Sequence, residues 1–165
     1  MSKTTENLQA AFAGESQANR KYLAFARKAE QEGHQQVARL FRAAAQAETV
    51  HALNHFRALG EVKSTAENLQ AAIAGENYEV VNMYPDFIKE AEAEGEKKAL
   101  TSLQYAWEVE KVHEQLYRKA LEALGATGPE FDYYVCPVCG YTSEGSAPEK
   151  CPVCGTPGSR FELIH

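Results

Sequence analysis

The sequence predicts a mainly α-helical protein, a four-helix bundle followed by a small β domain that a metal ion holds together. Long segments rich in Ala, Leu, Glu, Gln and Lys, which are good helix formers, are separated by single glycines. A helical segment occurs twice, and all four cysteines lie between positions 136 and 154. We therefore expect a helical domain over residues 1–128 and a metal-bound domain over residues 129–165.

The helical part is an internal duplication. Residues 6–15 read ENLQAAFAGE and residues 67–76 read ENLQAAIAGE, at an offset of 61. Further along the chain the offset is 62, which aligns the pairs Gly33 and Gly95, Glu48 and Glu110, and His51 and His113. The chain therefore contains two copies of one helical hairpin, and the second copy carries a one-residue insertion.

The ends of the helices are marked by residues that favour helix termini. Glycine adopts the left-handed conformation without a Cβ penalty, and the candidate stops are Gly33, Gly60, Gly95 and Gly125. Residues 64–67 have the pattern of a capping box. Pro85 lacks the N–H group that would bond to the Val81 carbonyl, so we expect a kink there. The expected helices are 4–32, 35–59, 66–94 and 96–124.

Acids and histidines recur at matching positions of the two hairpins. Each hairpin has a Glu on its first helix and a Glu-x-x-His sequence on its second, namely Glu15 with Glu48 and His51, and Glu76 with Glu110 and His113. At ~1.5 Å per residue these acids, together with Glu79, lie at about the same distance from the turns of their hairpins. A Glu and a His three residues apart lie on one face of a helix.

Two interpretations of this pattern compete. A single helical Glu is most often a solvated surface charge, and a polar core without metal is a second possibility. However, the faces that carry these acids are otherwise apolar, and buried carboxylates without partners are costly. The joint pattern therefore favours a dinuclear site, and carboxylates with two imidazoles suit iron or manganese.

The four cysteines form two Cys-Pro-Val-Cys-Gly sequences, with Cys136 and Cys139 in the first and Cys151 and Cys154 in the second. Two such knuckles indicate one tetrathiolate metal site in a reducing compartment, and hence a cytoplasmic protein. The glycine after each knuckle lets the backbone bend toward the sulfurs. Zinc and iron share this ligand set. The neighbouring dinuclear site favours iron, because a redox centre needs an electron donor.

Composition excludes two classes of partner. The formal net charge is −6 and the basic residues are scattered, which argues against a nucleic-acid groove. No uninterrupted apolar run reaches the ~20 residues that cross a bilayer, so no membrane partner is expected. The first residues show no secretory signal.

Along essentially its whole length the chain resembles the rubrerythrin family, which joins a ferritin-like diiron domain to a rubredoxin-like domain. The matching motifs are Gly14-Glu15-Ser16-Gln17-Ala18, Glu48-x-x-His51, Gly75-Glu76-x-x-Glu79, Met83-Tyr84-Pro85, Glu110-x-x-His113 and the paired knuckles. The resemblance implies a non-haem peroxidase that reduces hydrogen peroxide to water. It also implies a carboxylate-bridged site of two iron ions and one iron ion held by the four cysteines, where recombinant protein can carry zinc.

The resemblance implies roles for individual residues. Glu48 and Glu110 would bridge the irons, and the terminal ligands would be Glu15, Glu76 and His113. One iron of this family exchanges a glutamate for a histidine with redox state, and the matching positions are Glu79 and His51. Tyr22 and Tyr84 match tyrosines near the family's diiron pocket, where the resemblance implies a catalytic role in hydrogen-bonding ligands or relaying protons. Ordinary core packing also explains them.

Electrons would enter through the cysteine-bound iron, from NAD(P)H through a separate reductase or from free rubredoxin, since the chain has no dinucleotide-binding motif of its own. Two other functions stay open. One is a ferroxidase or iron-storage protein of the ferritin class, and the other is a helical binding module with a structural zinc ribbon.

The link between the two hairpins is short. Residues 61–66 span roughly 20 Å, whereas a helix of ~28 residues is roughly 42 Å long. The link cannot run back along a bundle as the ferritin-like topology requires. We therefore expect a domain-swapped homodimer in which each diiron site draws ligands from two subunits.

Overall fold

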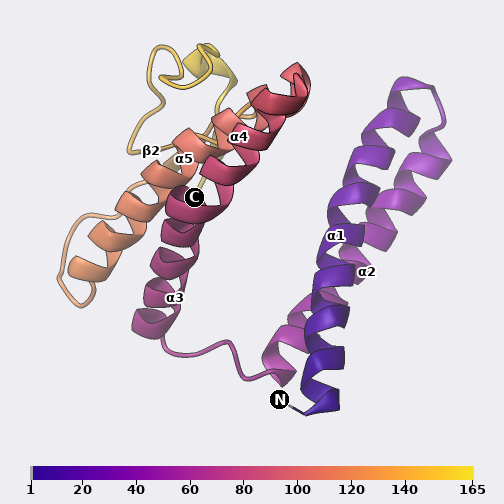
Figure 1. Cartoon of the computed structure of the whole chain (residues 1–165), viewed down its shortest axis with the longest axis horizontal. Coiled ribbons are helices and arrows are strands. Elements are labelled where there is room, and N and C mark those ends of the chain that lie inside the picture. Colours follow the sequence, from indigo (N-terminus) through magenta and orange to yellow (C-terminus); the bar gives the residue numbers. More distant parts are fainter. Residues whose placement is uncertain (1) are drawn as a thin grey trace. The chain divides into compact units, whose positions relative to one another are not determined.

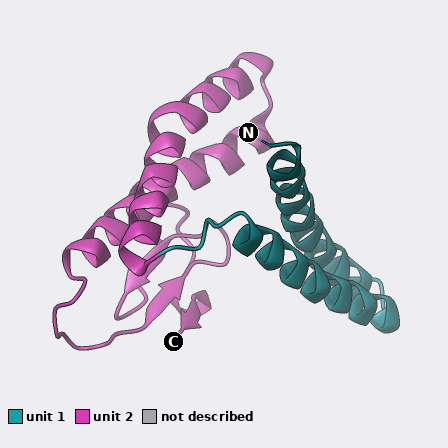
Figure 2. Ribbon diagram, turned by 90° about the horizontal axis from the view of Figure 1, so that it is seen from below, with its two compact units in different colours: residues 1–63 teal, residues 64–165 magenta. Residues whose placement is uncertain are grey.

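The structure is a computed structural model that describes residues 2–165 (Figure 1). The chain forms two compact units, Met1–Lys63 and Ser64–His165, and each is described by itself (Figure 2). The first unit is a helical hairpin, and the second combines a helical hairpin with a three-stranded sheet. The predicted fold class is therefore confirmed: the chain is mainly α-helical and carries a small C-terminal β module.

The first unit is a hairpin of α1 (Lys3–Gln31) and α2 (Gln35–Ala58). The side chain of Asn19 on α1 reaches α2, where its amide donates to the Ala45 carbonyl at 2.7 Å and to the Thr49 hydroxyl at 2.8 Å. Small side chains let the two helices approach closely. The buried positions of this hairpin are Ala26, Ala29, Ala38, Ala45 and Ala52.

The second hairpin begins at the capping box that the sequence predicted. The Ser64 hydroxyl accepts from the Glu67 N–H, and the Glu67 carboxylate accepts from the Ser64 backbone. The first helix of this hairpin is divided into α3 (Thr65–Tyr78), a π-helix η1 (Glu79–Met83) and α4 (Tyr84–Glu94). The second helix is α5 (Lys97–Glu122). The four glycines predicted to end helices all have positive φ. The predicted helix limits agree with the observed ones to within two residues.

The interruption before Pro85 is a π-helix and not a simple proline kink. The Tyr84 N–H bonds to the Glu79 carbonyl five residues back, which is the π pattern. In this register the N–H that Pro85 lacks would have bonded to Val80, five residues back. The Trp107 indole N–H of α5 donates to the Val80 carbonyl instead, at 2.8 Å.

The π-helix accounts for the one-residue insertion in the second copy of the hairpin. The offset between the copies is 61 at Glu15 and Glu76 but 62 at Tyr22 and Tyr84. The extra residue therefore lies between positions 76 and 84, where η1 lies. A π turn accommodates one more residue than an α turn, so the helix continues beyond it with its buried face restored.

The C-terminal module is an antiparallel sheet in the order β2-β1-β3, with Tyr134 of β1 opposite Ser143 and Leu163. The two knuckles lie outside the sheet and repeat each other. The Gly140 N–H bonds to the Cys136 carbonyl at 2.9 Å, and the second knuckle closes with an equivalent bond of the same length. The remaining elements are β1 (Tyr133–Val135), β2 (Thr142–Glu144), the 3-10 turn η2 (Gly158–Arg160) and β3 (Glu162–Ile164).

This module packs against α5 of the same unit. Lys119 of α5 forms an ion pair with Glu144 of β2. Gly140 lies against Val109, because a Cβ on this glycine would be 3.8 Å from the valine Cγ1. Compactness therefore divides the chain after Lys63, and the division at residue 128 into a helical and a cysteine domain stays a prediction. Within residues 2–165, no helix has the length and apolarity needed to cross a bilayer.

Candidate metal centres

The first hairpin brings three potential ligands together across its two helices. Oxygen atoms of Glu15 on α1 and Glu48 on α2 and a ring nitrogen of His51 all lie within 4.8 Å of one another. The Glu48 carboxylate is 2.9 Å from His51 Nδ1. Both residues come from consecutive turns of α2, so the helix itself sets their spacing. The His51 side chain is 54% exposed.

The second hairpin repeats the arrangement with Glu76 of α3 and Glu110 and His113 of α5. Here the Glu110 carboxylate is 2.7 Å from His113 Nδ1, and the His113 side chain is only 27% exposed. Each three-residue set therefore lies within a single hairpin, one set in the first and one in the second. Each offers hard oxygen donors and one imidazole, and this donor chemistry fits iron or manganese.

The charges of the second set are balanced by protons. Burial and the neighbouring Glu110 charge raise the pKa of Glu76 to about 7. The hydrogen bond that His113 donates to the Glu110 carboxylate raises the pKa of His113. The pKa of Glu110 is lowered: burial opposes the shift, but the bond to His113 and its positive charge prevail. In the absence of a cation, Glu76 and His113 thus hold protons that a metal ion would displace.

A hydroxyl of the cysteine module fixes the ring of His113. The Thr142 hydroxyl donates to the Gly140 carbonyl at 3.1 Å, so its oxygen accepts from the Nε2–H of His113 at 3.0 Å. This bond selects the tautomer that leaves Nδ1 for a metal. Such outer hydrogen bonds orient histidine ligands in metal sites generally.

Glu79 lies beside the second set but outside it. It is the first residue of η1, and its carboxylate is not among the atoms that lie within 4.8 Å of one another. Burial and the Glu110 charge raise its pKa. Its counterparts in the first hairpin are Ala18 at offset 61 and Gln17 at offset 62, so the extra acid belongs to the second copy alone.

The two tyrosines that the sequence singled out differ in their surroundings. The pKa of Tyr84 is raised by its burial and then by the charges of Glu79 and Glu110. Tyr22 packs among aromatic rings, with its centroid 6.1 Å from that of Phe41 and 6.4 Å from that of Phe25. The acids of the second hairpin therefore lie near Tyr84, whereas Tyr22 is part of the apolar packing of α1 and α2.

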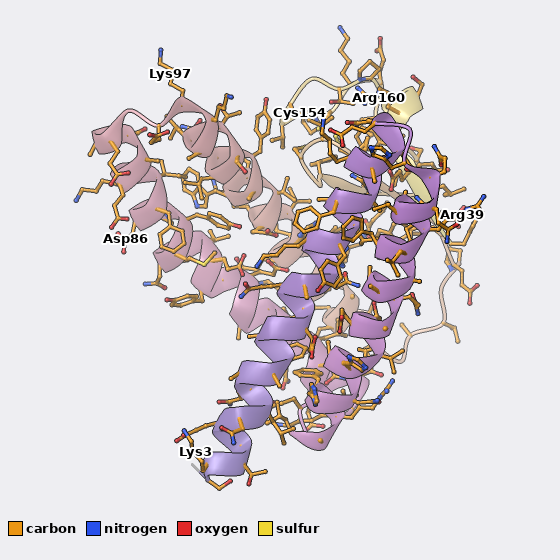
Figure 3. All side chains as sticks on the ribbon, turned by 90° about the vertical axis from the view of Figure 1, so that its right-hand side faces the viewer. Lys3, Arg39, Asp86, Lys97, Cys154 and Arg160 are labelled. Atoms are coloured by element: carbon orange, nitrogen blue, oxygen red, sulfur yellow. The ribbon has the colours of Figure 1, made fainter. Side chains whose placement is uncertain are left out.

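The four cysteines converge in the C-terminal module, where Figure 3 labels Cys154. Cys136 Sγ lies 3.6 Å from Cys154 Sγ, and Cys139 Sγ lies 3.4 Å from Cys151 Sγ. Thiolates around one tetrahedral ion with bonds of ~2.3 Å lie roughly 3.8 Å apart, so the donors fit iron or zinc. Although burial opposes it, the bonds from Thr156 lower the pKa of Cys154 to about 6.

Three residues of the site were missed in the sequence analysis. Trp107 bonds to the π-helix and Thr142 bonds to His113. Tyr117, one turn beyond His113, has its pKa raised by burial and then by Glu76, and it lines a cavity of about 310 Å³ beside the histidine. Only Tyr117 had a signal in the sequence, since it lies four residues after His113 on one helix face.

The fold and these donor sets define a class of protein: a non-haem metalloprotein with carboxylate–histidine sites in helical hairpins and a separate tetrathiolate module. The comparisons identify the family. The family model Rubrerythrin matches residues 6–121, and the model of the rubrerythrin rubredoxin-like domain matches residues 134–162. The chain belongs to the rubrerythrin family.

Relatives that are named rubrerythrin or nigerythrin support this family assignment. The chain is 39% identical to nigerythrin of Nitratidesulfovibrio vulgaris, over 96% of this chain and 85% of that protein. It is 39% identical to a rubrerythrin of Porphyromonas gingivalis, over 98% and 90% of the two chains. The solved structure of fully reduced, all-ferrous nigerythrin covers 99% of this chain and 88% of its own, with a TM-score of 0.61 and 36% identity.

Metal uptake by the second hairpin is expected to release protons. Because Glu76 has a pKa of about 7 and the pKa of His113 is raised, both are largely protonated below neutral pH. Mn²⁺ affinity should therefore rise as pH rises through about 7 and level off above it, with roughly one to two protons released at pH 6. Calorimetry in buffers of different ionisation enthalpy, on protein with zinc in the cysteine site, measures this number.

The matched control for proton release is Glu76→Gln, which removes one titrating group. It should lower the release by about one proton. Binding of Mn²⁺ with no proton release at pH 6 would contradict the proposed protonation of this hairpin.

Proposed function

We propose that the protein is a peroxidase that reduces hydrogen peroxide to two molecules of water, with two electrons supplied through the cysteine module and two protons. The observation that carries the proposal is the Thr142–His113 hydrogen bond of 3.0 Å, which joins the two kinds of metal site within one chain. Membership of the rubrerythrin family supports it. A ferroxidase of the ferritin class would have no evident use for the tetrathiolate module.

The ligand roles follow from the family resemblance and from the two three-residue sets. Glu48 and Glu110 would serve as the ligands shared by the two irons, and Glu15, Glu76 and His113 as terminal ligands. Glu79 and His51 would be the residues that exchange with redox state. When bound, the iron pair would supply the two electrons that cleave the O–O bond. The carboxylates of the chain would hold the pair and compensate its charge.

Tyr84 is proposed to deliver a proton to the site. Its hydroxyl experiences the charges of Glu79 and Glu110, which together with burial raise its pKa and keep it protonated. A protonated phenol beside the site is a hydrogen-bond donor toward an oxygen that leaves as water. Tyr22 is proposed to support the ligand set of the first hairpin through its ring contact with Phe41.

Electrons are proposed to pass from the cysteine-bound iron to the bundle through residues of one chain. Gly140 directly follows Cys139, its carbonyl accepts from Thr142, and Thr142 accepts from His113. Only hydrogen bonds and the peptide chain separate the thiolate from the imidazole. The electrons come ultimately from NAD(P)H through a separate reductase, or from a rubredoxin. The protein would act in the cytoplasm.

The assembly is proposed to be a domain-swapped homodimer. Helix α2 ends at Ala58 and α3 begins at Thr65, so residues 59–64 form the link. Six residues span about 20 Å, which is shorter than the roughly 36 Å of α2. Each hairpin holds one acid–acid–histidine set, so a partner copy that contributes the complementary hairpin would complete the site.

Peroxide should reoxidise the reduced protein through the bundle site. When the protein is reduced anaerobically and mixed with one equivalent of hydrogen peroxide, the absorbance of both centres should return rapidly. Glu48→Ala removes a bridging carboxylate and should abolish this reaction, whereas Glu90→Ala, an exposed acid on α4, should leave it unchanged. Equal reoxidation of the Glu48→Ala protein would rule out the proposed site.

The Thr142→Val variant tests the electron route. In this variant the first oxidation of the bundle by peroxide is measured separately, because His113 also loses the hydrogen bond that fixes its ring, and the slowing of the second step is judged against that first rate. The subsequent reoxidation of the cysteine-bound iron, followed by its thiolate charge-transfer band, should slow by roughly tenfold. Ser143→Ala on the same strand is the matched control. An unchanged second phase in Thr142→Val would exclude this route.

Mixing two inactive variants tests the swap. In a swapped dimer, one chain with Glu48→Ala and one with Glu110→Ala share one intact site and one doubly damaged site. After co-refolding, half of the dimers are mixed, so about a quarter of wild-type activity should return. Without a swap every site keeps one damaged hairpin, and the mixture should stay as inactive as either variant alone.

A further inference from the structure

The π-helix decides which residues of the second hairpin face the metal site. Tyr84 follows Glu76 by eight residues. In a continuous α-helix this spacing would place the two side chains about 80° apart around the helix axis. In the first hairpin Tyr22 follows Glu15 by only seven residues, about 20° from alignment. The wide turn η1 absorbs the extra residue. Glu79 is the first residue of η1, and Tyr84 directly follows η1. With the extra residue absorbed, both residues stay on the helix face that carries Glu76.

This turn has a weak point at the Val80 carbonyl. In an α-helix the N–H of Tyr84 would bond to it, but in η1 that N–H bonds to Glu79. In the π register the donor would be residue 85, which is a proline without an N–H. The helix therefore supplies no regular donor to this carbonyl. An unpaired backbone carbonyl in a partly buried position is costly, so the register needs a donor from outside the helix.

Trp107 of α5 is that donor. Its indole N–H meets the Val80 oxygen at 2.8 Å in a partly buried setting. The ammonium group of Lys111, one turn further along, lies over the indole ring at 3.3 Å from the centroid, and its bond to Glu108 at 2.7 Å holds it in place. The ring is thus anchored from both sides.

The first hairpin shows that this contact belongs to the insertion. The position that corresponds to Trp107 there is Ala45, and α1 runs past it without a π turn. The hydrogen bond between the two helices at this position runs the other way: the Asn19 amide of the first helix, α1, donates to the Ala45 carbonyl of the second helix, α2. The indole donor therefore occurs only in the copy that has a carbonyl in need of one.

We propose that Trp107 is a positioning residue, which holds the π-helix through its bond to the Val80 carbonyl and thereby sets the position of Glu79 at the metal site. This inference rests on the proposed function only in taking Glu79 as a metal ligand. Trp107 is not a member of either acid–histidine set. Its effect on the metal passes through the backbone of η1.

Hydrogen exchange of the metal-free, full-length protein tests the first half of the proposal. Trp107→Phe keeps a ring on α5 and removes the N–H, so protection of the amides in residues 79–84 should fall by roughly tenfold. Adding Pro85→Ala supplies a backbone N–H five residues beyond Val80, and protection should return. Tyr105→Phe, an aromatic control on the same helix, should leave protection unchanged. Unchanged protection in Trp107→Phe would overturn the proposal.

Mn²⁺ titration followed by electron paramagnetic resonance tests the second half, with zinc in the cysteine site. Trp107→Phe should weaken Mn²⁺ binding by roughly tenfold, and Pro85→Ala should restore it. Combined with Glu79→Gln, Trp107→Phe should add little, because both act through one carboxylate. Combined with Glu76→Gln, which precedes η1, the two losses should multiply. Independent losses in both combinations would overturn the proposal.

The two experiments separate this proposal from the proposed function. If the wild-type bundle bound no Mn²⁺, the metal site and the proposed function would fail, while hydrogen exchange would still show whether Trp107 holds η1. If the wild type bound Mn²⁺ normally and Trp107→Phe changed neither measurement, the proposed function would stand and the role of Trp107 would not.

Discussion

The whole structure depends on the cost of placing carboxylates between helices. Glu76 and Glu110 are partly withdrawn from water and close to each other, which is unfavourable for two negative charges. Protons or cations must neutralise them. In the metal-free chain the pKa values of Glu76 and His113 are raised, so both groups bind protons more readily there than in water. The hairpin therefore binds protons at the positions where metal ions would bind, and a metal ion that enters the site replaces these protons.

Much of the fold follows from the sequence because the signals are local. Gly95 ends α4 in the left-handed conformation, and the Ser64–Glu67 capping box opens α3. Both depend only on neighbouring residues. The Glu110–His113 contact was also predictable, because three residues along a helix place two side chains on one face whatever the helix packs against.

The contacts that complete the site come from residues distant in sequence, and no local pattern announces them. The change of offset from 61 to 62 shows that one residue is added between Glu76 and Gly95, but not whether it is looped out or forms a π turn. We propose that this choice depends on Trp107, which donates to the Val80 carbonyl from another helix. Thr142 reaches His113 only because the cysteine module packs on α5.

The two hairpins share a ligand pattern but not its surroundings, and the difference has a chemical sense. His113 is 27% exposed and held by Thr142, so its ring is fixed. His51 is 54% exposed, and the second hairpin alone has the additional acid Glu79. The proposed exchange of Glu79 for His51 at one metal needs an imidazole that can move, and His51 is the more exposed of the two histidines. The duplicated hairpins carry the same Glu and Glu-x-x-His pattern. The second hairpin differs in its π-helix, in the Trp107–Val80 bond and in the Thr142–His113 bond.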